Sequence, residues 1–190
     1  MEVKLTKITI DNVDVFLDEI GPNAGKITIS DSYNHNYSYY WGAMGGTLAN
    51  FITLMDPNYF ANNLINYNNR NVFDAKKTFA VLRKFIKEEL DLPWYKHQEF
   101  QKNLREVLNE FENEFLDGPS INYFVDNFYS MFINRLSYDL IGQGFEREFL
   151  EKEFRTISEP WEFSATKESD DYIWLKKFHT KLKKSIKKLK

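Results

Sequence analysis

Asp31 and His35 are the residues best suited to acid–base chemistry, because a carboxylate beside an imidazole can orient the ring and hold a proton. No nucleophile or metal partner accompanies this pair, and the chain contains no cysteine. Its three histidines lack the spacing of a metal-binding motif, and His97 and His179 are expected on helix surfaces. We therefore expect a non-enzymatic protein without catalytic residues, metal site or cofactor; a hydrolase using Asp31 and His35 is the alternative.

A glycine-rich segment, Gly42-Ala43-Met44-Gly45-Gly46, lies between an expected strand and an expected helix, where a phosphate-binding loop would be placed. The Lys-Ser or Lys-Thr pair that completes such a loop is missing, as is a full dinucleotide fingerprint. We expect instead a tight turn that lets Trp41 pack beneath the following helix.

An aromatic run precedes these glycines, and its members are Tyr33, Tyr37, Tyr39, Tyr40 and Trp41. Successive side chains of a strand point to opposite faces, so one face cannot bury all of these rings. An exposed Tyr or Trp could anchor a protein interface or stack on nucleobases. Because no Lys or Arg occurs between Lys26 and Arg70, a protein partner or core packing is favoured over a nucleic-acid groove.

Three glutamates at intervals of four, Glu106, Glu110 and Glu114, are expected on one face of a helix. Such a face is usually only solvated. Regularly spaced carboxylates can also imitate the phosphates of a nucleic acid for a basic protein partner. Both interpretations stay open, and the three glutamates join the aromatic run as predicted partner-binding residues.

The C-terminal segment is strongly basic. The formal net charge is −3, yet residues 176–190 hold eight lysines and no acid, which leaves 17 basic and 28 acidic side chains in residues 1–175. The lysines that could contact nucleic acid are Lys176, Lys177, Lys181, Lys183, Lys184, Lys187 and Lys188. Apolar residues recur between them at helical spacing, so the helix could dock on the acidic body, or bind nucleic acid or an anionic membrane surface.

A small β-unit must position the aromatic run. Apolar and polar residues alternate over residues 3–10 and 13–19, and β-prone segments follow at residues 26–30 and 37–41. Asp11-Asn12 is a plausible turn between the first two. These segments predict an antiparallel sheet of three to four strands.

The remainder of the chain is predicted to be helical. The expected helix caps are Thr47, Asp56, Asp74, Ser120 and either Ser169 or Asp170. The asparagine-rich stretch 62–71 is expected to be a loop between the two parts. We predict an α+β fold with about five to seven helices in the C-terminal part, divided into a β-rich module with short helices at residues 1–68 and a helical region at 69–190, or fused into one domain.

Composition limits the cellular setting. The chain has 190 residues, 43% hydrophobic and 17% aromatic content, and no cysteine, as expected for a folded protein of a reducing compartment. It shows neither the pattern of a signal peptide nor a run of about 18 apolar residues that could span a bilayer. We expect a cytoplasmic protein that does not enter the membrane; composition does not indicate an oligomeric state.

The string Tyr-Trp-Gly-Ala-Met-Gly at residues 40–45, with residues 25–29 before it and 48–64 after it, resembles a module of small uncharacterised phage and prophage proteins. The resemblance covers about the first 65 residues. Phage accessory proteins of this size often antagonise host defence, so it implies an inhibitor, such as an anti-CRISPR protein, that binds a host nuclease or defence complex in the bacterial cytoplasm. The alternative is a nucleic-acid-binding accessory protein that uses the lysine-rich terminal helix.

Overall fold

The computed structural model describes residues 4–32, 35–90, 98–116, 120–142, 146–148, 152–153, 157 and 159–189. The chain forms two compact units: unit 1 comprises Met1–Asn71 and Glu168–Lys190, and unit 2 comprises Val72–Lys167. The α+β prediction is confirmed. The first limit of unit 1 lies close to the predicted boundary at residue 68, whereas the residues from Glu168 onward group with the β-unit, because the terminal helix packs on the sheet.

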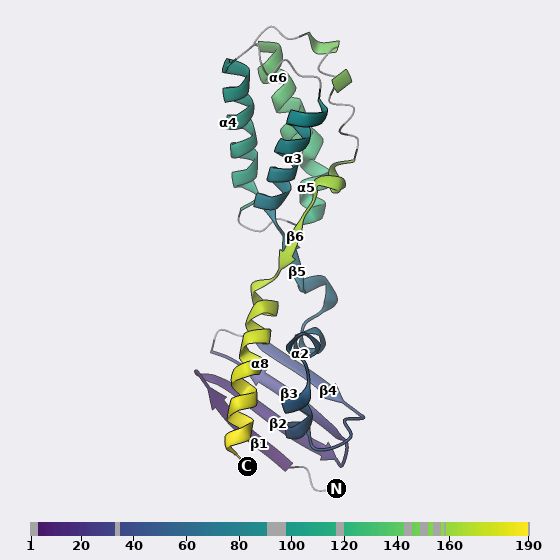
Figure 1. The fold of residues 1–190 in the computed structure, drawn as a ribbon, viewed down its shortest axis with the longest axis vertical. Coiled ribbons are helices and arrows are strands. Elements are labelled where there is room, and N and C mark those ends of the chain that lie inside the picture. Colours follow the sequence, from purple (N-terminus) through teal and green to yellow (C-terminus); the bar gives the residue numbers. More distant parts are fainter. Residues whose placement is uncertain are drawn as a thin grey trace. The chain divides into compact units, whose positions relative to one another are not determined.

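Unit 1 is built on a four-stranded antiparallel sheet in the order β1-β2-β3-β4 (Figure 1). The strands are β1 Lys4–Ile10, β2 Val13–Gly21, β3 Ala24–Ser30 and β4 Asn36–Trp41, which confirms the four predicted strands. Each strand pairs with the next along the chain, so three short connections suffice to form the sheet.

The first of these connections is the predicted turn at Asp11 and Asn12. Ile10 pairs directly with Val13, and the two turn residues have φ angles of 49° and 67°. Left-handed backbone at both positions is typical of the two-residue turns that match the twist of a hairpin, and Asp and Asn tolerate it better than other side chains. The predicted turn is confirmed.

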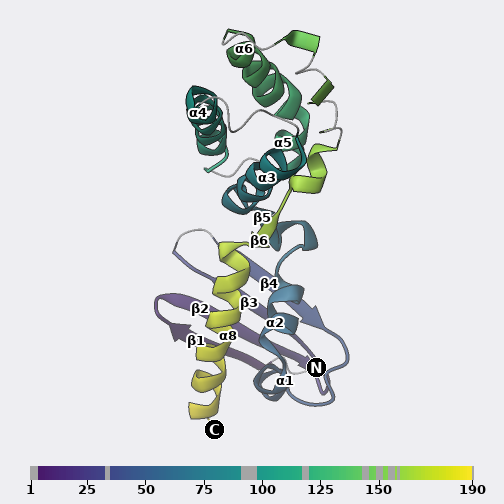
Figure 2. The ribbon, with the colours of Figure 1, turned by 45° about the horizontal axis from the view of Figure 1, so that its top comes forward.

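Three helices cover one face of this sheet (Figure 2): α1 Leu48–Leu54, α2 Pro57–Leu64 and α8 Asp170–Lys188. Their first turns are capped by the predicted side chains of Thr47, Asp56 and Ser169, each of which accepts a hydrogen bond from a backbone N–H of its own helix. Alternate strand residues form the core beneath them: Ile8, Ile10, Val13, Val15, Leu17, Ile27, Ile29 and Trp41. No described helix of unit 1 packs on the other face of the sheet.

Gly25 allows α1 to approach the sheet closely. A Cβ atom at this position would lie 2.9 Å from the carbonyl oxygen of Asp18 and 3.1 Å from the Leu48 side chain. Real Cβ atoms do not approach backbone oxygens so closely, so any other residue would displace the helix or the strand. Gly25 also pairs with Trp41, whose ring lies on the same, helix-covered face.

Unit 2 is helical, with α3 Ala75–Glu89, α4 Gln98–Glu114, α5 Ile121–Asn127 and α6 Asn134–Gly142. The π-helical stretch η2 Phe128–Ile133 joins α5 to α6, so the helix predicted from Ile121 is present but contains an unpredicted insertion. Phenylalanines dominate the core, and seven of those that the structure describes are buried in one cluster: Phe73, Phe79, Phe111, Phe115, Phe124, Phe128 and Phe163.

Two short strands lie where the chain passes from one unit to the other and back. They are β5 Asn71–Phe73 and β6 Thr166–Glu168, which pair with each other; β6 follows the short 3-10 helix η3 Pro160–Phe163. The prediction of a loop over residues 62–71 is therefore wrong in part. Here α2 continues to Leu64, and a 3-10 turn, η1 Tyr67–Asn69, is capped by Asn66, so the asparagines end and begin elements instead of forming one long loop.

Candidate functional site

The aromatic run divides between the two faces of β4. Tyr37, Tyr39 and Trp41 lie on the helix-covered face, where the Trp41 ring contacts the rings of Tyr39 and Phe51 at centroid distances of 4.9 and 5.7 Å. Trp41 is only 5% exposed, and Tyr37 and Tyr39 are half-buried. Tyr40 points to the open face and is 51% exposed. The fifth member, Tyr33, lies outside the described residues.

On the open face, Tyr40 ends a cross-strand row whose other members are Leu5, Asp18 and Lys26. Leu5 is 59% exposed, so the apolar residues of β1 that are buried are Ile8 and Ile10. Ile8 and Ile10 point to the buried face of the sheet, and successive side chains of a strand alternate between its two faces. Leu5 lies an odd number of residues from both, so its side chain points to the open face. The open face thus combines two exposed apolar side chains with charges of both signs.

Asp31 and His35 do lie together, as a hydrolase would require. Nδ1 of His35 is 2.9 Å from Oδ2 of Asp31, and this hydrogen bond raises the pKa of His35. The neighbouring Tyr37 ring stacks on Trp174 at 5.9 Å, and burial, with the nearby Asp171 carboxylate, raises the pKa of Tyr37 to about 12. Tyr37 therefore stays protonated near neutral pH.

No Ser or Thr hydroxyl within the described part of the chain is hydrogen bonded to His35, so the dyad has no activated nucleophile there. The raised pKa favours a charged imidazole ring, and the Asp31 carboxylate stabilises that charge. This arrangement suits an ion pair that fixes the turn between β3 and β4.

The glycine-rich segment does not hold an open phosphate site. Gly45 adopts a φ of 70°, as a tight turn requires. The N-terminus of α1, where a phosphate would bind, is occupied by the Glu19 carboxylate, which accepts hydrogen bonds from the N–H groups of Leu48 at 3.0 Å and Ala49 at 3.5 Å. A second anion beside this carboxylate would be repelled.

The acidic stripe of α4 is partly neutralised. Glu106 lies 3.8 Å from Lys102, and Glu110 forms an ion pair with Arg135 of α6. Glu114 is exposed, and no ion pair joins it to a described residue. Because a paired carboxylate attracts a basic partner less strongly than a free one, the stripe offers a weaker imitation of phosphates than its spacing indicates.

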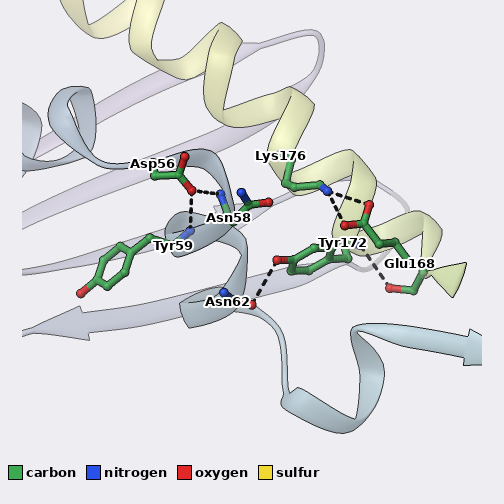
Figure 3. A network of polar contacts seen from close by, with 8 residues as sticks. Asp56, Asn58, Tyr59, Asn62, Glu168, Tyr172 and Lys176 are labelled. Carbon is green, nitrogen blue, oxygen red and sulfur yellow. Dashed lines mark hydrogen bonds and ion pairs between the residues drawn. The ribbon is translucent and has the colours of Figure 1, made fainter. Parts of the chain in front are cut away.

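Two of the lysines that were predicted to contact nucleic acid form hydrogen bonds with other residues of unit 1. Lys176 bonds both carboxylate oxygens of Glu168 at 2.6 Å, beside Tyr172 (Figure 3). Lys183 donates to the carbonyl of Met55, at the end of α1, at 2.6 Å. Both ammonium groups therefore have a fixed partner, and they are poor candidates for contacting a ligand.

The other lysines form a continuous exposed face of α8, called here the lysine face: Lys177, Lys181, Lys184, Lys187 and Lys188. Only one of the five, Lys181, has an ion-pair partner in the described residues, the exposed Asp11 at 2.6 Å. The opposite side of α8 is buried against the sheet and the other helices through Leu175, Phe178, Leu182 and Ile186. The predicted docking by the apolar face is confirmed, and it leaves the lysine face in solvent.

His179 is fully buried, so its predicted place on a helix surface is wrong. Its Nε2 lies 2.9 Å from the carbonyl of Ile52, and its ring stacks on Phe60 at 4.5 Å. Burial lowers the pKa of His179, which favours the neutral ring. The spacing of four from Leu175 places His179 at the edge of the apolar stripe of α8. Its polar ring nevertheless favoured a surface position in the sequence interpretation.

A protein-family model described as a phage family matches residues 1–188. The chain belongs to this phage family. The match runs through both units, beyond the 65 or so residues of the resemblance carried by the aromatic string. No curated protein and no solved structure matches the chain.

Charge is divided unevenly between the two units of the phage protein. Unit 1 contains 12 basic and 10 acidic residues, and unit 2 contains 13 basic and 18 acidic residues. The positive charge of unit 1 comes mainly from α8, since residues 1–71 hold only four basic side chains. Within unit 1, a polyanion is thus attracted mainly to α8.

The described residues of the phage protein contain no group of three or more His, Asp or Glu side chains placed to hold a metal ion. None of its described helices is long and apolar enough to cross a membrane. Sequence reasoning missed one further feature, a pocket in unit 2 lined by Arg83, Lys87 and Arg105. Because Arg83 and Lys87 are four residues apart, the sequence could have placed both on one face of a helix. Arg105 comes from another helix, so its position beside them could not be predicted.

Proposed function

We propose that this phage protein is a non-enzymatic binding protein of the bacterial cytoplasm that contacts nucleic acid through the lysine face of α8. The observation that carries the proposal is the exposure of these five lysines after the apolar side of the helix has docked. The segment from Lys177 to Lys188 extends about 16 Å along the helix axis. That length matches about five successive phosphates of one strand.

Binding of this kind is electrostatic and should depend strongly on salt, because each lysine that neutralises a phosphate releases a condensed counterion. It should also be largely independent of sequence, since contacts to phosphates carry no sequence information. Tyr40 belongs to the other face of the sheet from α8, so base stacking by the aromatic run is not part of this proposal.

The first prediction concerns Lys177→Gln, Lys184→Gln and Lys188→Gln combined. We expect this variant to bind a fluorescent 20-nucleotide DNA, single- or double-stranded, at least about tenfold more weakly at 50 mM NaCl, because three phosphate contacts are lost. The slope of log K against log salt should fall by about two to three. Fluorescence anisotropy over 50–200 mM NaCl measures both quantities.

The matched control removes three exposed lysines from unit 2: Lys76→Gln, Lys84→Gln and Lys102→Gln. Its net charge equals that of the first variant, and its affinity should stay close to that of the wild type. The proposal fails if the wild type does not bind DNA at 50 mM NaCl, or if both variants bind equally.

The second function that we propose is inhibition of a host defence protein, such as a nuclease, in the manner of an anti-CRISPR protein. Membership of a phage family supports it, as does the exposure of Tyr40 and Leu5 at the two ends of one row on the open sheet face. Tyrosine is among the residues that most often dominate binding energy at protein interfaces. The exposed carboxylates of Glu106 and Glu114 provide a second surface for a basic partner.

This second function predicts that Tyr40→Ser with Leu5→Ser abolishes capture of a defence protein from host lysate and protection of the phage. Tyr138→Ser, at a position 80% exposed in unit 2, is the matched control and should retain both. If only Glu106→Gln with Glu114→Gln removes capture, the acidic helix is the interface instead. Unchanged capture and protection in every variant would reject both surfaces.

A further inference from the structure

Unit 2 contains a pocket of about 340 Å³ between α3 and α4. It is lined by Arg83 and Lys87 from α3 and by Gln101, Leu104, Arg105 and Leu108 from α4. Among the lining residues that the structure describes, three are cations and none is an acid. The unit as a whole has 13 basic and 18 acidic residues, so this group of three cations contrasts with its overall acidic composition.

Arg83 is held in place at the wall of the pocket. One terminal nitrogen of its guanidinium donates to Glu112 at 2.6 Å and to Asn109 at 2.9 Å, and the group lies 6.0 Å from the centre of the Phe79 ring. Both polar contacts use the same nitrogen. The guanidinium carries further N–H donors in a fixed plane, which can therefore bond an oxygen ligand without reorganisation.

Lys87 and Arg105 are the cations available to a ligand. Both are exposed, and neither forms an ion pair with any residue that the structure describes. Their neighbours behave differently, since Lys84 and Lys102 each face a glutamate of their own helix at 3.8 Å. Two of the three cations that line the pocket, Lys87 and Arg105, are thus without an ion-pair partner among the described residues, whereas the third, Arg83, is paired with Glu112.

We propose that this pocket binds a phosphorylated small molecule of about the size of a mononucleotide. A planar guanidinium pre-oriented by two hydrogen bonds, beside a second Arg and a Lys, is suited to phosphate oxygens. The volume exceeds that needed by a phosphate ion and lies at the lower end of the range of small-molecule sites. Leu104 and Leu108 offer apolar contact for the remainder of the ligand. The site goes beyond the proposed function, since it lies in unit 2 and the lysine face in unit 1.

Isothermal titration of the full chain with AMP, ATP, inorganic phosphate and adenosine tests the proposal. We expect AMP and ATP to bind at one site, inorganic phosphate to bind at least tenfold more weakly than AMP, and adenosine not to bind. Lys87→Gln with Arg105→Gln should weaken AMP binding at least tenfold. Lys84→Gln with Lys102→Gln removes the same charge from the same two helices outside the pocket and should retain the wild-type affinity.

The melting temperatures of both double variants serve as a folding control, and they should agree because all four side chains are exposed. The proposal is overturned if neither AMP nor ATP binds at millimolar concentration, or if the two double variants lose affinity equally. It is also overturned if AMP binding is lost on substitution of the lysine face but not of the pocket. Equal affinities for phosphate and AMP would reject a ligand of mononucleotide size.

Discussion

Replacing Phe124 with alanine is expected to lower the free energy of unfolding of unit 2 by about 3–5 kcal/mol, the range typical of removing a buried aromatic ring. Phe124 is fully buried at the centre of the phenylalanine cluster. Five rings lie with their centroids 5.2–6.3 Å from its own: Phe73, Phe79, Phe111, Phe115 and Phe128. Its removal would leave a cavity that these large, mutually packed rings cannot close without shifting several helices.

Native-state hydrogen exchange is the suitable measurement, because it reports the stability of α3 to α6 separately from that of the sheet in unit 1. Tyr138→Ala in the same unit serves as the comparison, since the side chain is 80% exposed and its loss should change stability by no more than about 0.5 kcal/mol. A loss below 1 kcal/mol for Phe124→Ala would show that the cluster repacks, and would contradict the described core.

Helix starts were predictable because the interactions that make them are local. The caps at Thr47, Asp56, Asp74 and Ser120 were each predicted from a side-chain acceptor placed before an apolar repeat, and the cap of α8 was predicted to be Ser169 or Asp170, of which the structure shows Ser169. In each case the acceptor and the N–H group that it binds are two or three residues apart, so no knowledge of the tertiary fold is needed.

The placement of α8 was not predictable in the same way. Its contacts with the rest of unit 1 join residues more than 100 positions apart, such as Tyr172 with Asn62 and Lys183 with Met55. Amphipathic periodicity shows that one side of the helix is buried, but it does not show which surface covers it. The strand β6 was missed because its three residues are all exposed and carry no alternation.

For the candidate site too, the sequence shows which residues are present but not which partners they contact in the fold. The terminal helix carries seven candidate lysines and α4 carries a row of glutamates, yet some of the ion pairs that neutralise them come from distant segments, as with Arg135 on Glu110 and Asp11 on Lys181. What distinguishes the lysine face from the other lysines is therefore a property of the fold. The same is true of the pocket between α3 and α4, whose cations come from two helices.

Trp41→Ala is the second substitution for which we expect a large effect, a loss of about 3–5 kcal/mol from the stability of unit 1. Trp41 is 5% exposed and packs between Tyr39 and Phe51, opposite Gly25 in the sheet. Its neighbour Tyr40 has the opposite orientation on the same strand, so Tyr40→Ala should change stability by no more than about 0.5 kcal/mol. Hydrogen exchange of the β2 and β3 amides measures both losses.

This contrast decides how the aromatic run can be tested for function. A Trp41 variant that fails to bind a partner would show only that unit 1 has lost stability, whereas a Tyr40 variant of wild-type stability that fails to bind would place the interface on the open sheet face. Equal destabilisation by the two substitutions would mean that Tyr40 also packs in a core. The open face would then have no exposed aromatic anchor from β4, and the inhibitor proposal would have to rest on the acidic helix.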